Sequence, residues 1–173
     1  MTREDFLIEF RQEHRQIRDL LFDMITSFIQ KDLKRSAVLL NELDILTGPH
    51  FRYEEEALYP ALIKIYGEFY INKLISDHDL AIARAMKLSS MLSKENYYKE
   101  DQTECINTVR SILPHVSDCE GLSIMVEKLD DSDIRIICKS VINARTGNTP
   151  LIEWAETARN RKLLSFKNES IIS

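Results

Sequence analysis

The apolar residues of this chain recur at alternating steps of three and four, which is the spacing of a helix that buries one face. In residues 3–30 the steps fall on Phe10, Ile17, Leu21, Met24 and Phe28. In residues 68–94 they fall on Ile71, Leu74, Ala81, Ala85, Leu88 and Leu92. His14 and His78 occupy the vacant steps of these two series. Both histidine side chains are therefore predicted to point into the core of a helical bundle.

Two further long helices complete the predicted bundle. One is expected over residues 32–66, with bends at Gly48-Pro49 and Pro60 and an end at Gly67. The other is expected from Lys99 to about Leu129, with an interruption at Pro114. We therefore predict an all-α fold, an up-down-up-down four-helix bundle over residues 1–130.

The remaining residues, 131–173, are predicted to form a helical extension that packs on the bundle. A short helix follows the acidic cap at Asp130 and continues to about Ala144. Another is expected over 151–164, where Trp154 anchors it on the bundle, and the stretch from Ser165 is expected to fray.

Composition excludes several classes of protein. The net charge is −5, with acidic and basic residues interspersed and no cluster of Lys and Arg, which argues against nucleic-acid binding. No stretch reaches the roughly 20 apolar residues of a membrane-spanning helix, and the first residues lack the apolar segment of a signal peptide. The three cysteines have no C-x-x-C spacing, so a disulfide framework is not expected. We expect a cytoplasmic protein with neither nucleic-acid nor membrane partners.

The chain has four histidines, and the interval from His14 to His50 nearly equals that from His78 to His115. One histidine on a buried face is usually a core residue bonded to a backbone or hydroxyl group. Four in one core are harder to tolerate, because each unsatisfied buried polar group costs about 1–3 kcal/mol. A shared metal removes that cost for all four, and imidazole with carboxylate suits iron, manganese or zinc. The set therefore favours a metal site.

Carboxylates near the second and fourth histidines are the other candidate ligands. Glu54 follows His50 by four residues and shares its helix face, whereas Glu55 and Glu56 are expected to lie on a solvated face. After His115, both Cys119 and Glu120 are candidates. Regular helix geometry favours Cys119, and a helix start at Pro114 leaves room for Glu120. Tyr53 and Tyr59 are interpreted as packing residues.

These motifs resemble those of the hemerythrin-like, or HHE cation-binding, four-helix bundles. The segment from His50 to Glu55 is similar to their H-F-x-x-E-E motif, and the segment from His115 to Glu120 to the fourth-helix motif H-x-x-x-x-D/E. His14 and His78 resemble the histidines of the first and third helices. The resemblance spans about residues 5–130.

The resemblance implies a non-haem di-iron centre with an oxo or hydroxo bridge. Its metal ligands would be the bridging carboxylates of Glu54 and Glu120 and the terminal imidazoles of His14, His50, His78 and His115. Oxygen-carrying members have one more histidine, at the position of Leu74 in this chain. That difference leaves an open coordination position and argues against a purely reversible oxygen carrier.

The resemblance favours a protein that binds O2 or NO, with room for redox chemistry. An iron sensor, or an iron donor for the repair of iron–sulfur centres, is the first alternative. A ferritin-like oxidase is disfavoured, since no glutamate lies three residues before a histidine. A metal-free helical interaction module is opposed by the four inward histidines.

Overall fold

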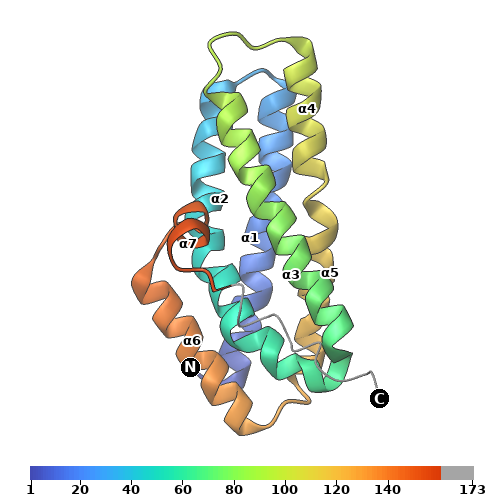
Figure 1. The fold of residues 1–173 in the computed structure, drawn as a ribbon, viewed down its shortest axis with the longest axis vertical. Coiled ribbons are helices and arrows are strands. Elements are labelled where there is room, and N and C mark those ends of the chain that lie inside the picture. Colours follow the sequence, from blue (N-terminus) through green and yellow to red (C-terminus); the bar gives the residue numbers. More distant parts are fainter. Residues whose placement is uncertain (161–173) are drawn as a thin grey trace, which may run out of the picture.

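The computed structural model describes residues 1–160 of the chain, and the regular structure in this part is helical throughout. Four columns run up, down, up and down (Figure 1), which confirms the predicted all-α four-helix bundle. The elements are α1 (Arg3–Ile29), α2 (Leu33–Tyr53), a π-helical turn η1 (Glu54–Leu58), α3 (Tyr59–Leu92), α4 (Lys99–Arg110), α5 (Leu113–Val126), α6 (Asp131–Gly147) and α7 (Leu151–Thr157). The fourth column is formed by α4 and α5 together.

The breaks in the columns follow from individual residues. Gly67 has φ 79°, a conformation open to glycine, and the backbone is non-helical there, so the predicted helix end at Gly67 is found as a break between two helices within α3. Pro114 lies in the first turn of α5, where a missing backbone N–H costs nothing, and the predicted interruption of the fourth column occurs there. Pro49 remains inside α2. The α2 helix passes into the π-helical turn η1 at Glu54, a departure that the sequence pattern does not predict.

The histidines lie where two apolar clusters of the core meet. Phe10 and Leu74 belong to one cluster, and Ile17 and Ala81 belong to the other. In each helix the histidine stands between the two members named, so His14 and His78 lie at the same level of the bundle. Apolar side chains therefore cover the buried histidines from above and below along the bundle axis, as the spacing of apolar residues predicts.

The helices α6 and α7 pack against α2. Gly48 of α2 permits the close approach of α7, because a Cβ there would lie 2.1 Å from the backbone oxygen of Thr149. Trp154 is 2% exposed, in keeping with its expected anchoring role. The α7 helix ends at Thr157, earlier than predicted, and the expectation for the stretch from Ser165 lies outside the described residues. Within residues 1–160 no helix has the length and apolar character needed to cross a membrane.

Candidate metal centre

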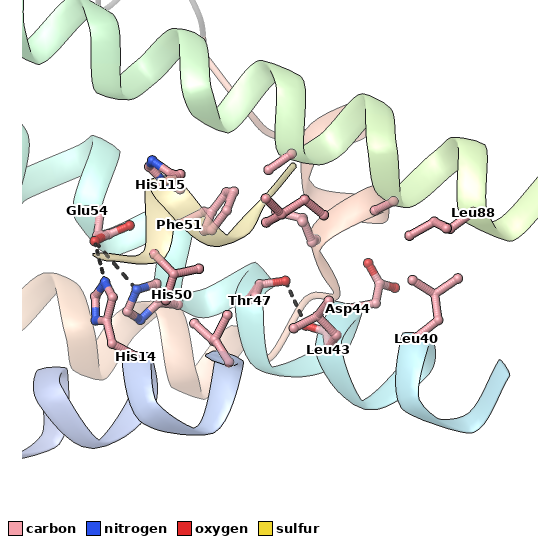
Figure 2. A pocket seen from close by; sticks show the side chains of 16 residues that line it. His14, Leu40, Leu43, Asp44, Thr47, His50, Phe51, Glu54, Leu88 and His115 are labelled. Carbon is pink, nitrogen blue, oxygen red and sulfur yellow. Dashed lines mark hydrogen bonds and ion pairs between the residues drawn. The ribbon is translucent and has the colours of Figure 1, made fainter. Parts of the chain in front are cut away.

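The four histidines converge as predicted, in two neighbouring pairs. The ring centroids of His14 and His50 are 4.6 Å apart, and those of His78 and His115 are 4.8 Å apart. All four residues are buried, with exposed fractions between 0% and 8%. Figure 2 shows His14, His50 and His115 around the carboxylate of Glu54.

Glu54 is the centre of this arrangement. Its Oε1 lies 3.5 Å from Nε2 of His50 and 3.9 Å from Nε2 of His14, while its Oε2 lies 3.1 Å from Nε2 of His78. The residue is 0% exposed, and Oε1 has no hydrogen-bond partner within the described chain. A buried charged oxygen without a partner is costly. This atom is therefore suited to a cation.

Three of the histidines are held by their other ring nitrogen, Nδ1. The acceptor is the backbone oxygen of Phe10 for His14, a carboxylate oxygen of Glu13 for His50, and a carboxylate oxygen of Glu55 for His78, each at 2.8 Å. With Nδ1 engaged in each of these bonds, Nε2 is the ring nitrogen that faces Glu54. Metal-binding histidines in proteins characteristically have this arrangement.

The expectation of a solvated Glu55 is wrong. Its carboxylate is 4% exposed and accepts from Nδ1 of His78, and its two oxygens accept from the guanidinium of Arg159 at 2.6 and 2.9 Å. The π-helical turn that begins at Glu54 departs from regular helical spacing, and Arg159 supplies the charge that compensates the burial. Tyr53 and Tyr59 also exceed a packing role, since their hydroxyls contact His50 and His78 at 2.8 and 3.0 Å.

On the fourth column the structure brings Cys119, and not Glu120, into the cluster. The Cys119 Sγ is 3.1 Å from the Tyr59 hydroxyl and 3.6 Å from Nε2 of His115, and the residue is 1% exposed. The Glu120 carboxylate instead accepts from Arg18 at 2.8 Å, with a side chain 29% exposed. His115 already lies inside the helix α5, so the residue four positions on shares its face. The placement of Glu120 does not support its expected bridging role.

The protonation of the cluster follows from burial and neighbouring charge. Burial lowers the pKa of each imidazole, but at His50 the carboxylates of Glu54 and Glu13 outweigh it and raise the pKa to about 10. At His14, burial and the charge on His50 lower the pKa to about 4, and at His115 burial and the charge on His78 lower it to about 3. Near neutral pH, His14 and His115 are therefore in the neutral form that binds metals. Burial raises the pKa of the Cys119 thiol well above its ordinary value.

A cavity of about 30 Å³ begins at this cluster and extends along the bundle (Figure 2). One end is lined by His14, His50, Glu54 and His115. The other is lined mainly by apolar side chains, among them Leu40, Leu43 and Leu88. Since about 10–15 Å³ suffices for one water molecule, this cavity has room for a diatomic molecule beside the cluster.

Two groups of donors lie close enough for one ion, with ligand atoms within 4.8 Å of one another: His78, His115 and Cys119, and His14, Glu54 and Cys119. The model of the hemerythrin HHE cation-binding domain matches residues 5–119. The match thus includes Cys119 and stops before Glu120. No curated protein and no solved structure matches the chain.

Proposed function

Because the chain belongs to the hemerythrin HHE cation-binding family, which binds metal cations, typically iron, we propose that it is a non-haem di-iron protein that binds O2 or NO. The observation that carries this proposal is the orientation of three imidazoles. His14, His50 and His78 each bond an acceptor through Nδ1 and turn Nε2 toward one buried carboxylate, Glu54. Ordinary core histidines have no reason to share such an orientation.

The donor set supports two metal positions better than one. Glu54 Oε1 faces the pair His14 and His50, and Oε2 faces His78, whose neighbour is His115. A carboxylate between two pairs of imidazoles is placed to bridge two ions. In this proposal His14, His50, Glu54, His78 and His115 hold the metal, and Cys119 replaces Glu120 as the inward residue of α5.

The residues around the donors keep the site dry and its rings fixed. Phe51 stacks on His78 with ring centroids 3.7 Å apart and an interplanar angle of 9°, and Phe10 lies 4.3 Å from the ring of His14. Leu74, which stands where oxygen carriers have a further histidine, is fully buried in the apolar core. When bound, iron supplies electrons and a coordination position for a diatomic ligand, and the cavity beside Glu54 gives that ligand apolar walls.

A second candidate is iron handling, as a sensor or as a donor to iron–sulfur centres. The apolar Leu74 favours this second function, because a site with fewer histidine ligands holds its iron less tightly. Iron-loaded protein distinguishes the two functions when it is exposed to NO, to O2 and to a mild chelator. A gas-binding protein changes its visible spectrum with either gas and keeps its iron against the chelator. Release of the iron within minutes, with no spectral response to either gas, contradicts our proposal and favours iron handling.

Paired substitutions on α5 test the fourth-column ligand. We expect Cys119→Ser to change the visible spectrum and weaken the retention of iron, because Sγ lies inside the cluster. We expect Glu120→Gln to keep nearly the full iron content, because its carboxylate is engaged by Arg18 outside the cluster. Metal analysis and absorption spectra of both variants give the answer. If Glu120→Gln loses iron and Cys119→Ser does not, Glu120 and not Cys119 is the metal ligand on α5.

A further inference from the structure

Two arginines of the C-terminal extension lie directly behind the histidines of the metal centre. Arg145 of α6 donates from Nη2 to Oε1 of Glu13 at 2.7 Å, and Glu13 accepts from Nδ1 of His50 through its other oxygen. Arg159, which follows α7, donates from Nη2 to Oε1 of Glu55 at 2.6 Å, and the same oxygen accepts from Nδ1 of His78. Both arginines lie beyond the residues that the family model matches.

The two contacts have the same layout on opposite sides of Glu54. In each, a guanidinium from the extension holds a glutamate, the glutamate accepts from Nδ1, and the Nε2 of that histidine faces Glu54. The two glutamates come from different columns, Glu13 from α1 and Glu55 from η1. Such a repeat is not explained by the docking of the extension alone, because any surface carboxylate would serve docking.

Burial makes the arginine at Glu55 necessary. The side chains of Arg159 and Glu55 are 6% and 3% exposed, and Arg159 also donates to Asp79 at 2.7 Å and lies 5.7 Å from the Trp154 ring centroid. A buried carboxylate needs donors on its oxygens, and the guanidinium of Arg159 donates to both oxygens of Glu55. A bidentate guanidinium fixes the orientation of the carboxylate it holds. The imidazole of His78 is then held through Nδ1, with Nε2 turned toward Glu54.

The arginine that contacts Glu13, Arg145, is more exposed to solvent than Arg159. The side chain of Arg145 is 37% exposed, and it contacts Glu9 as well as Glu13. Glu13 is also held by the hydroxyl of Tyr53 at 2.6 Å. Removal of Arg145 therefore leaves Glu13 with a second donor and with solvent. Of the two arginines, Arg159 has the larger effect on its histidine.

We propose that Arg145 and Arg159 are positioning residues of the metal centre, through which the C-terminal extension fixes the orientation and proton position of His50 and His78. This inference rests on the proposed metal site. Partners of this kind behind a metal-binding histidine typically alter metal affinity by about 10- to 100-fold when they are removed. The extension is thus part of the site.

Arg159→Gln and Arg159→Lys, with Arg3→Gln as the matched control, test this inference. Arg3 also fastens the bundle to the start of α6, through Asp131 and backbone oxygens, and touches no glutamate of the site. Affinity for Co²⁺ is measured by competition with a chelator, and ¹⁵N NMR of the imidazoles of metal-free protein reports whether His78 has its proton on Nδ1. Circular dichroism verifies the fold of each variant.

We expect Arg159→Gln to weaken Co²⁺ binding about 10-fold or more and to remove the Nδ1–H signature of His78, with Arg159→Lys recovering part of both. Arg3→Gln should change neither. Unchanged affinity and an unchanged His78 signal in folded Arg159→Gln overturn the inference, as does an equal loss in Arg3→Gln. If the unaltered chain binds no metal, the proposed function fails, and the NMR signals of metal-free protein still decide whether Arg159 positions His78.

Discussion

Glu54→Gln is expected to abolish most iron binding while the helical bundle stays folded. The substitution keeps the shape of the side chain but removes the negative charge that faces His14, His50 and His78. Without that charge a divalent cation loses the carboxylate ligand that faces these three imidazoles. Iron bound per chain, measured after loading and desalting, should fall from about two to well below one.

The matched control for this variant is two residues away. Glu56 carries the same group on the same turn, but its side chain is 39% exposed and pairs with Arg52 at 3.0 Å. Glu56→Gln should therefore load as much iron as the unaltered protein. Full iron occupancy in Glu54→Gln, or an equal loss in both variants, would show that the cluster around Glu54 is not the metal site.

Metal binding is expected to raise the melting temperature of the protein strongly. The Oε1 atom of Glu54 is buried without a hydrogen-bond partner in the described chain, and it is poorly satisfied without a cation. An ion that binds the folded chain alone adds about 4 kcal/mol at a free concentration 1,000 times its Kd. For a chain of this size that corresponds to a rise of roughly 8–16 °C. Thermal unfolding followed by circular dichroism, with and without iron, measures it.

The Glu54→Gln variant separates this stabilisation from nonspecific effects of the metal. Its melting temperature should be nearly the same with and without iron, because the carboxylate that organises the donors is gone. Equal melting temperatures for the metal-free and metal-loaded unaltered protein would mean that the folded chain binds no iron beside Glu54, which contradicts the role proposed for this residue.

The level of the histidines in the bundle could be predicted from the sequence, because it depends on local periodicity. His14 and His78 fill vacant steps of two apolar series, and both are buried where the helix pattern places them. Glu54 follows from His50 in the same way. These positions need only local helix geometry, which α1 and the part of α3 after Gly67 provide, and Glu54 keeps its place one turn after His50 although the π-helical turn begins there.

The outer layer of the site could not be predicted, because it depends on contacts between distant parts of the chain. Glu55 is buried through Arg159, which lies 104 residues away, and nothing in the local sequence indicates that pair. Glu120 is held outside the cluster by Arg18, 102 residues away. The family resemblance favoured Glu120 as the inward residue. Regular helix spacing after His115 favoured Cys119, and that spacing predicted the residue that the structure places in the cluster.

The most direct test of this account is an anomalous difference map, recorded at the iron absorption edge from crystals of the iron-loaded protein. We expect iron on both sides of the Glu54 carboxylate, beside His14 and His50 near Oε1 and beside His78 and His115 near Oε2. Iron peaks at any other place in the chain, with none beside Glu54, would contradict it.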